Sequence, residues 1–341
     1  MTDLSYTSFE IPLANPLQTA SGSIDTRRGF VVRYGDGLGE ATPLSGWTET
    51  PKATEEALEA AGEHVPGAPS RGLLACDDAP AARHGLSQAM LDYHARRRGL
   101  PLYRYLGASE PIHTVTVNAI LDETPVDALT TQASQAIADG FRTLKLKVGR
   151  GPIDHDIERL RQLRRTVGDE IELRADANGS WSTANAVGVC RQVRELDLAY
   201  LEQPTSVHDT ANLGVLAETG VPIALDETIA AGEVLTALRS PVTAIIIKPM
   251  AVGGIDRALA IAKATRQCGK LPVISDLITG AVGRAGAIHL AAVVNAATAH
   301  GLATGSRLDG DLVEGVGAVT NGCVSVPSGL GIGLDTEVFR R

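Results

Sequence analysis

The spacing of apolar residues changes about one third of the way along the chain. Before residue 43, apolar and polar positions alternate over 4–11 and 29–34, which predicts strands joined by the polar loop 16–26. Helical spacing follows over 54–64 and 79–98. We therefore expect the first hundred residues to form a small α+β unit with loops long enough to act as lids.

From about residue 114, short apolar segments alternate with amphipathic helical segments, a pattern typical of parallel β/α units. Eight such segments in one series favour a closed barrel, with a doubly wound sheet as the alternative. No GxGxxG motif follows any of them, which disfavours a dinucleotide-binding sheet. The predicted strands are 114–120, 143–148, 172–177, 199–204, 222–227, 244–249, 272–276 and 301–304.

The composition is that of an ordinary globular protein. The 341 residues suffice for one large domain and a smaller one, and 31 basic against 40 acidic residues disfavour nucleic acid and anionic membranes. Four scattered cysteines without a CxxC pair predict reduced thiols. No uninterrupted apolar span and no secretory signal is visible, so we expect a cytoplasmic protein.

Two lysines share one face of an apolar predicted strand. Lys145 and Lys147 lie two residues apart, and side chains alternate across a strand, so both point to the same side. Two ammonium groups there are costly unless anions lie close by. Either the lysine ends reach solvent, or carboxylates from neighbouring strands meet them.

The next strands end in matching charges, one in each β/α unit: Asp176, Glu202, Asp226 and then Lys248. In a parallel barrel the C-terminal strand ends surround the functional site. Three converging carboxylates repel unless a cation lies among them. All-oxygen ligation without His or Cys suits a hard divalent metal, Mg²⁺ by default with Mn²⁺ as a substitute. The alternative is a set of structural ion pairs.

Two lysines beside such a metal suit proton abstraction next to a carboxylate. Lys147 and Lys248 would approach from opposite sides of the barrel mouth. A nearby divalent cation disfavours the ammonium form of a lysine, which lets the amine act as a base. A metal that holds the substrate carboxylate would stabilise an enediolate, an arrangement described for the enolase superfamily.

The order of these motifs closely resembles the muconate-lactonizing subgroup of the enolase superfamily. The motifs are Lys-x-Lys, Arg-Ala-Asp-Ala-Asn-Gly, Glu-Gln-Pro and Leu-Asp-Glu, at 145–147, 174–179, 202–204 and 225–227. The resemblance runs along the whole chain and implies an α/β fold, a modified TIM-type (β/α)7β barrel with an N-terminal α+β capping domain. The implied parts are the capping domain 1–108, the barrel 109–318 and a C-terminal segment 319–341 that returns to the capping domain with a strand at 323–326.

The resemblance also implies residue roles. Mg²⁺ would be bound by Asp176, Glu202 and Asp226, the acid/base pair would be Lys147 and Lys248, and Lys145 would help neutralise a carboxylate substrate. Residues expected to contact substrate are Asn118, Ser23, Trp47, Asp276 and Thr304, with Ser23 and Trp47 in the closing loops 21–24 and 46–48. Residues expected to support the ligands are Asn178, Gln203 and Glu227. A homo-oligomer is compatible with the sequence.

Within the subgroup, segments 39–50 and 300–305 look like o-succinylbenzoate synthase, which dehydrates 2-succinyl-6-hydroxy-2,4-cyclohexadiene-1-carboxylate in menaquinone biosynthesis. There Lys147 would be the base and Lys248 would remain a cation. Dipeptide epimerases of the subgroup usually carry Asp-x-Asp where Arg307-Leu308-Asp309 stands here, and an arginine suits an anion rather than an ammonium. Against the synthase, Asp276 stands where a small neutral residue is expected.

Other activities stay open as alternatives. Dipeptide epimerases, N-acylamino acid racemases and muconate cycloisomerases of the subgroup use the same lysine pair. Outside enzymology, the alternative is a non-catalytic barrel braced by its metal. His300 is a candidate to line the pocket, whereas His289, within an apolar helical segment, is expected in the core.

Overall fold

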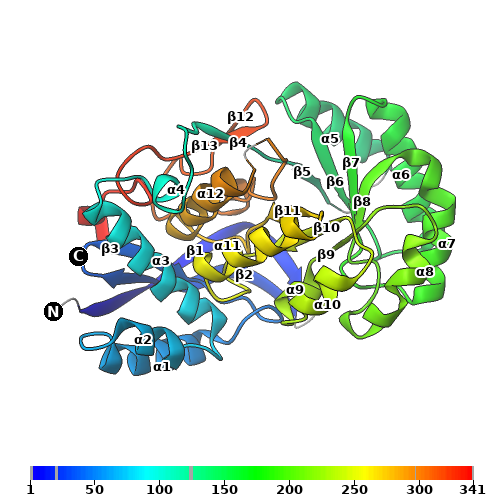
Figure 1. Cartoon of the computed structure of the whole chain (residues 1–341). Coiled ribbons are helices and arrows are strands. Elements are labelled where there is room, and N and C mark those ends of the chain that lie inside the picture. Colours follow the sequence, from blue (N-terminus) through cyan, green and yellow to red (C-terminus); the bar gives the residue numbers. More distant parts are fainter. Residues whose placement is uncertain (1–2, 20–21, 123–125, 296, 340–341) are drawn as a thin grey trace.

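The computed structural model describes residues 3–19, 22–122, 126–295 and 297–339, and it contains a parallel β/α barrel beside a smaller α+β capping unit (Figure 1). Isolated bridges from Ser275 to Gly301 and from Val117 to His300 close the barrel sheet. This arrangement confirms the predicted modified TIM-type fold. The sheet order is β11-β10-β9-β8-β7-β6-β5, with β5 at Ala119–Leu121, β6 at Thr143–Lys147, β7 at Glu172–Asp176, β8 at Leu198–Glu202, β9 at Ile223–Leu225, β10 at Ala244–Ile247 and β11 at Leu271–Ile274.

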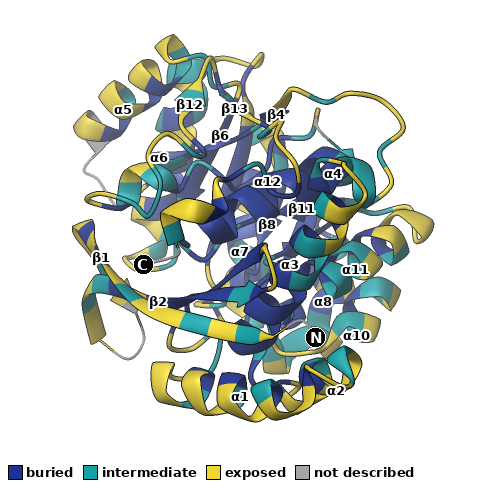
Figure 2. Cartoon of the chain, turned by 90° about the vertical axis from the view of Figure 1, so that its left-hand side faces the viewer, coloured by how far each residue is buried: buried dark blue, intermediate teal, exposed yellow. Residues whose placement is uncertain are grey.

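Helices cover the outside of the barrel. Figure 2 shows β6, β8, β11 and α12 buried at the centre, with exposed outer faces on helices such as α5. Helix α12 is buried along nearly its whole length because it lies between the barrel and the capping unit. No helix in the described ranges is long and apolar enough to cross a membrane. The barrel helices are α5 (Val126–Ala138), α6 (Ile153–Val167), α7 (Thr183–Val193), α8 (Leu213–Ala217), α9 (Glu227–Ala230), α10 (Val234–Arg239), α11 (Ile255–Gln267) and α12 (Ala281–Asn295), with short 3-10 turns at Arg194–Leu196, Val207–Asn212, Gly305–Arg307 and Thr336–Phe339.

The capping unit packs one long helix directly onto an antiparallel sheet. Glycines make this approach close: a Cβ on Gly39 would lie 1.9 Å from the carbonyl oxygen of Gly85 in the helix. The strands are β1 (Leu4–Thr19), β2 (Gly22–Tyr34) and β3 (Gly37–Ala41), and the helices are α1 (Pro51–His64), α2 (Pro69–Ala75), α3 (Pro80–Arg97) and α4 (Leu102–Tyr105).

The prediction of a polar loop over residues 16–26 is wrong, because the described residues of this stretch are strand. Strands β1 and β2 continue through it as a two-stranded ribbon, which pairs Leu17 with Ile24 and Gln18 with Ser23 beyond an irregularity after Pro12. Most residues of this stretch are exposed, and Leu17 and Ile24 pack against a small apolar cluster that includes Leu44 and Leu277, so the stretch lacks the regular alternation from which strands are predicted. Residues 20 and 21, and with them one end of the expected closing loop 21–24, lie outside the described residues.

The first and last predicted barrel strands differ from the observed ones. The segment 114–120 divides into β4 (Thr114–Thr116) and β5, and the segment 301–304 makes only the closing bridges before it turns away. It turns because Leu308 bridges Leu13 of the ribbon and the Asp309 N–H donates to the Pro12 carbonyl, which draws the chain out of the barrel.

The C-terminal segment touches both parts of the molecule. The strand expected to return to the capping unit, β13 (Cys323–Ser325), pairs instead with β4 and with β12 (Val319–Thr320) at the start of the barrel. The capping unit is reached a few residues later: the Leu102 N–H donates to the Gly331 carbonyl over 2.6 Å, and the Ile332 N–H donates to the Asp92 carboxylate. The segment thus completes the capping unit through residues 331 and 332.

Candidate active site

The charged residues predicted from the strand ends meet at one end of the barrel. Lys147, the last residue of β6, pairs in register with Asp176 of β7, which pairs with Glu202 of β8. Asp226 directly follows β9 and Lys248 directly follows β10. The three carboxylates are almost inaccessible to solvent, with relative exposures between 0% and 2%. The barrel therefore buries three acidic groups side by side.

Lys145 joins two of these carboxylates. Its Nζ lies 3.0 Å from Asp176 Oδ2 and 2.9 Å and 3.1 Å from the two carboxylate oxygens of Glu202. Burial lowers the pKa of Lys145, but the two carboxylates raise this pKa by more than burial lowers it, so it lies well above its ordinary value. Burial likewise raises the pKa of Asp176, and Lys145 with Lys147 holds it well below the usual range. Lys145 and Asp176 are therefore a charged, hydrogen-bonded pair.

Nearby positive charge stabilises the anions of Glu202 and Asp226 less than it stabilises that of Asp176. Burial, followed by the charge of Asp176, raises the pKa of Glu202 to about 8 despite Lys145. Burial also raises the pKa of Asp226, although Lys248 forms an ion pair with it. A raised carboxylate pKa means that the anion is under-stabilised, so added positive charge at this point would be favourable.

The lysines predicted as the acid/base pair enter from two sides of the carboxylates. Lys147 Nζ lies 2.7 Å from Asp176 Oδ2 and 2.9 Å from Asn178 Oδ1. Lys248 lies across β7, β8 and β9 from it, and its Nζ is 3.8 Å from the ring centroid of Trp47 of the capping unit. Trp47, an expected substrate contact, thus covers the second lysine.

Two amides brace the strand ends. Asn178 and Gln203 both adopt positive φ angles, 46° and 37°, which residues other than glycine rarely adopt. Asn178 Nδ2 donates to Glu227 Oε1 over 2.9 Å, and Gln203 Oε1 accepts from the Asp226 N–H over 3.0 Å. All three residues expected to support the ligands therefore connect to the carboxylate cluster.

The donor set fits a hard divalent cation. It comprises three buried carboxylates from consecutive strands, with two raised pKa values, and no soft ligand from Cys or His contributes. Within the part of the chain that is described, no group of three or more His, Cys, Asp or Glu side chains lies close enough together to hold a metal ion without rearrangement. Lys145 instead pairs with both Asp176 and Glu202, and Lys248 pairs with Asp226.

The remaining expected substrate contacts are not all gathered at this cluster. Thr304 Oγ1 donates to Asp276 Oδ2 over 2.8 Å, and Asp276 lines a pocket with Lys248. Asn118 is buried and donates to the neighbouring Ala119 carbonyl. Ser23 lies exposed on the ribbon, where Gln18 donates to it. No described hydrogen bond connects Asn118 or Ser23 to the charged cluster.

Arg27, which the sequence analysis did not select, joins the capping unit to the barrel. It is 2% exposed and donates to the carbonyls of Thr42 and Pro43 in the capping unit, over 2.9 Å and 3.1 Å. It also donates to Leu277 and Ile278, in the loop before α12, over 3.3 Å and 3.1 Å. Burial lowers the pKa of Arg27 to about 10. Its partners are backbone atoms, which leave no sequence signal.

Glu40, also unselected, holds the start of α12. The Gly280 and Gly283 N–H groups each donate to its carboxylate over 2.7 Å, where the helix dipole favours an anion. Burial raises the pKa of Glu40, and the hydrogen bonds from Thr42, Gly283 and Gly280 oppose that rise. Arg27 and Glu40 together fix the β11–α12 loop against the capping unit.

His300 and His289 are both buried and have structural roles. His300 does not line the pocket: its Nδ1 accepts from the Ile274 N–H over 2.9 Å and its Nε2 lies 2.9 Å from the Asn295 carbonyl. Burial lowers the pKa of His300 and of His289 to about 4 each. His289 stacks on Tyr103 in the core, as predicted.

In this barrel a lysine on β6 and a lysine after β10 flank three carboxylates at the ends of the strands between them, and comparison with known proteins identifies the family. The chain belongs to the enolase superfamily: residues 128–338 match the family described as Enolase C-terminal domain-like. This finding confirms the family resemblance.

Several curated relatives that match most of the chain are dipeptide epimerases. The L-Lys-D/L-Arg epimerase of Methylococcus capsulatus is 30% identical over 98% of both chains. The L-Ala-D/L-Glu epimerase of Bacillus subtilis is 28% identical over 95% of this chain and 93% of that one. A crystal structure of the dipeptide epimerase from M. capsulatus, complexed with Mg and the dipeptide L-Arg-D-Lys, aligns with a TM-score of 0.84 at 28% identity over 97% of this chain and 98% of that one. These relatives are enzymes of the isomerase type, and the chain is similar to them.

Proposed function

We propose that this chain is a Mg²⁺-dependent isomerase that inverts the α-carbon next to a carboxylate, and specifically a dipeptide epimerase. The observation that carries the proposal is the placement of Lys147 and Lys248 on two sides of three buried carboxylates. Inversion needs a base on one face of the carbon and an acid on the other. The similarity to dipeptide epimerases supports the same activity.

In this proposal Asp176, Glu202 and Asp226 hold Mg²⁺. When bound, the metal supplies positive charge that stabilises the negative charge developing on the substrate carboxylate as the α-proton leaves. Lys145, already hydrogen-bonded to Asp176 and Glu202, keeps these two carboxylates aligned and adds a fixed positive charge on their side of the site.

The lysines of this chain then move the protons. The amine of Lys147 takes the α-proton from one face, and the electron pair of the broken C–H bond delocalises into the substrate carboxylate. The ammonium of Lys248 returns a proton to the same carbon from the opposite face. In the reverse direction the two lysines exchange roles, and the product differs from the substrate only in configuration.

The sequence analysis favoured o-succinylbenzoate synthase, with the epimerase as an alternative, and the relatives support the alternative better. Arg307, which suggested an anionic substrate group, forms an ion pair with Asp122 over 2.9 Å. The resemblance of segments 39–50 and 300–305 keeps the synthase as a second candidate. Rapid, EDTA-sensitive aromatisation of its substrate would assign that activity.

Exchange of the α-proton in deuterium oxide, followed by NMR, tests the epimerase. With Mg²⁺ we expect the wild type to exchange and epimerise members of a dipeptide panel, and EDTA to abolish both. Lys147→Ala and Lys248→Ala should each stop epimerisation and leave exchange with only one, opposite, epimer. If no dipeptide and no N-acylamino acid exchanges its α-proton, the isomerase proposal is wrong.

A further inference from the structure

A buried ion pair on helix α6 lies beside the turn that follows Lys147. Asp156 and Arg159 are each 2% exposed, and Arg159 Nη1 lies 3.1 Å from Asp156 Oδ1. Removing two charges from water is costly unless further hydrogen bonds satisfy both groups. The other partners of the two side chains therefore show what the pair holds in place. We call Asp156 and Arg159 the α6 brace.

Both members of the α6 brace bind the backbone around Lys147. Arg159 Nη1 donates to the Lys147 carbonyl over 2.9 Å. The Gly149 N–H donates to Asp156 Oδ2 over 2.7 Å. Hydrogen bonds in which one partner is charged are stronger than those between neutral groups. The brace therefore fixes the backbone on both sides of the residue that follows Lys147.

The end of β6 is also tied to the strands on either side of it. Arg159 Nη2 donates to the carbonyl of Asp122, which follows β5, over 3.0 Å. The Val148 N–H donates to the carbonyl of Asp176, the last residue of β7, over 2.9 Å. The backbone that carries Lys147 thus has a fixed position relative to the Asp176 carboxylate, to which the Lys147 ammonium is hydrogen-bonded.

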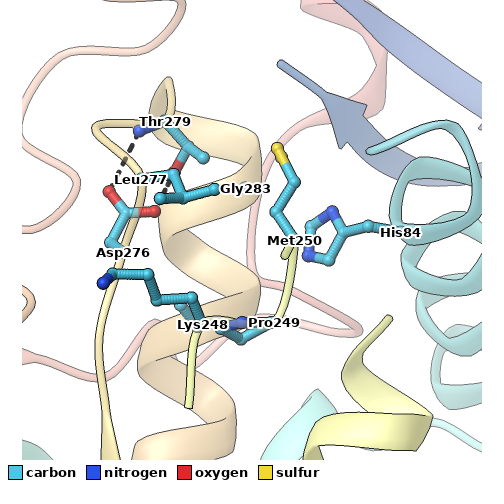
Figure 3. Close-up of a pocket in the computed structure, with 9 residues that line it drawn as sticks. His84, Lys248, Pro249, Met250, Asp276, Leu277, Thr279 and Gly283 are labelled. Atoms are coloured by element: carbon cyan, nitrogen blue, oxygen red, sulfur yellow. Dashed lines mark hydrogen bonds between the residues drawn. The ribbon is translucent and has the colours of Figure 1, made fainter. Parts of the chain in front are cut away.

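The second lysine of the proposed acid/base pair is supported differently. The Lys248 carbonyl accepts from the Val252 N–H over 3.1 Å, within the turn that follows β10. Figure 3 shows Lys248 and Pro249, where this turn begins, on the wall of a small pocket. Helix α11 also carries an aspartate in its first turn, but Asp256 pairs with Arg83 of the capping unit over 3.0 Å. The α6 brace therefore acts on one of the two lysines.

We propose that Asp156 and Arg159 are positioning residues for Lys147, whose amine they hold at one face of the reacting carbon. This inference rests on the proposed function and adds the side chains on which one of its two proton transfers depends. A base must lie within hydrogen-bonding reach of the proton that it abstracts. Misplacement by about 1 Å can slow a reaction by about 100-fold. Loosening the brace should therefore slow the transfer made by Lys147 and spare the one made by Lys248.

Exchange of the α-proton in deuterium oxide, measured separately for each epimer on the Mg²⁺-loaded protein, reports the two transfers one at a time. The epimer that Lys248→Ala still exchanges is the one from which Lys147 takes the proton, and we call it the Lys147 epimer. The epimer that Lys147→Ala still exchanges is likewise the Lys248 epimer. The two single variants thus assign each epimer to its base before the brace is changed.

Two variants loosen the α6 brace in different ways. Arg159→Lys keeps the charge but replaces a planar fork, which reaches two carbonyls, with a single ammonium. Asp156→Asn keeps the size of the side chain but replaces one of its two acceptor oxygens with a donor. In both variants we expect kcat for exchange of the Lys147 epimer to fall about 10- to 100-fold. KM and exchange of the Lys248 epimer should stay close to wild type, because the proposed metal ligands are unchanged.

Arg164→Lys is the matched control for a purely structural role. Arg164 lies on the same helix and donates to the Ile171 and Leu196 carbonyls, over 2.9 Å each, at the end of the barrel opposite Lys147. This control should lower stability without changing the ratio of the two exchange rates, because unfolded protein exchanges neither epimer. If the brace variants also leave that ratio unchanged, whether both rates fall or neither does, the inference is overturned.

The same measurements separate this failure from that of the proposed function. A wild type that exchanges neither epimer of any dipeptide would overturn the proposed function, and the inference would fall with it. A wild type that exchanges both epimers, with brace variants that slow them equally, would overturn the inference alone. Selective loss of the Lys147 epimer in both brace variants, with the ratio unchanged in Arg164→Lys, would establish the positioning role.

Discussion

Protonation of His300 should weaken the closure of the barrel in mild acid. Its Nδ1 accepts the Ile274 N–H at the end of β11, and its Nε2 lies within hydrogen-bonding distance of the Asn295 carbonyl. Only the neutral ring can do both, since a protonated Nδ1 would face another donor. Burial accordingly lowers the pKa of His300 to about 4, while an unfolded chain titrates at about 6.5.

The sign follows from proton uptake. Between these two pKa values the unfolded state binds more protons than the folded state, so the free energy of unfolding falls as the pH falls from 6.5 towards 4. For a pKa of about 4 in the folded state and about 6.5 in the unfolded state, moving from pH 7 to pH 5 costs about 2 kcal/mol. The same reasoning applies to His289.

Urea unfolding followed by circular dichroism at pH 7 and pH 5, at constant ionic strength, measures this cost. His300→Asn should lower stability at pH 7, because it loses the Asn295 contact and leaves a cavity, but it should lose about 2 kcal/mol less than the wild type on acidification. His155→Asn, which replaces an exposed histidine, is the control and should follow the wild type. If His300→Asn and the wild type lose equal stability between pH 7 and pH 5, the reasoning is refuted.

Three further predictions concern packing, the interface with the capping unit and the metal. Gly39→Ala should destabilise by about 3 kcal/mol in urea unfolding, because its Cβ meets the α3 backbone, whereas Gly62→Ala, which faces open space in α1, should be neutral or stabilising; equal effects would contradict the close approach. Arg27→Lys keeps the charge but not the fork of donors, so it should cost about 2 kcal/mol and speed amide hydrogen exchange at residues 277–283; unchanged exchange there would contradict the role of Arg27. Glu202→Gln should weaken Mg²⁺ binding by at least about 10-fold in calorimetry, and unaltered affinity would remove Glu202 from the ligand set.

The barrel and its charged strand ends could be predicted because both follow from short periods in the sequence. Alternation places Lys145 and Lys147 on one face, and the repeat of β/α units brings Asp176 and Glu202 to adjacent strands, where the register aligns them. These relations need no knowledge of distant contacts. The fold class and the members of the charged cluster can therefore be predicted from short-range patterns in the sequence.

The parts that could not be predicted depend on contacts between distant segments. No pattern in the sequence marks Arg27 or Glu40 as buried, but each hydrogen-bonds to backbone atoms more than 200 residues away. The segment 301–304 has strand composition, yet the ribbon draws it out of the barrel through Leu308. His300 looked like a pocket residue because nothing in the sequence shows that both ring nitrogens have backbone partners.

The charged cluster does not by itself determine which reaction is catalysed. The same two lysines and three carboxylates suit dehydration as well as inversion, and the sequence analysis chose dehydration from loop segments and from Arg307. That residue, however, already has a carboxylate partner in Asp122 and is not free to attract an anion in this arrangement. The positions that could distinguish the two reactions are therefore those around the cluster, such as Asp276, which lines a small pocket with Lys248.

The cluster itself is better explained by chemistry than by stability. Buried ion pairs such as Lys145 with Glu202 seldom stabilise a fold more than well-packed apolar side chains of similar volume, because removing both charges from water costs more than their attraction returns. A barrel that needed only support would be as stable with apolar residues at these positions. Burial and the charge of Asp176 raise the pKa of Glu202, so Lys145 leaves this carboxylate incompletely compensated. Incomplete compensation disfavours a purely structural ion-pair network and leaves an electrostatic need that a divalent cation would meet.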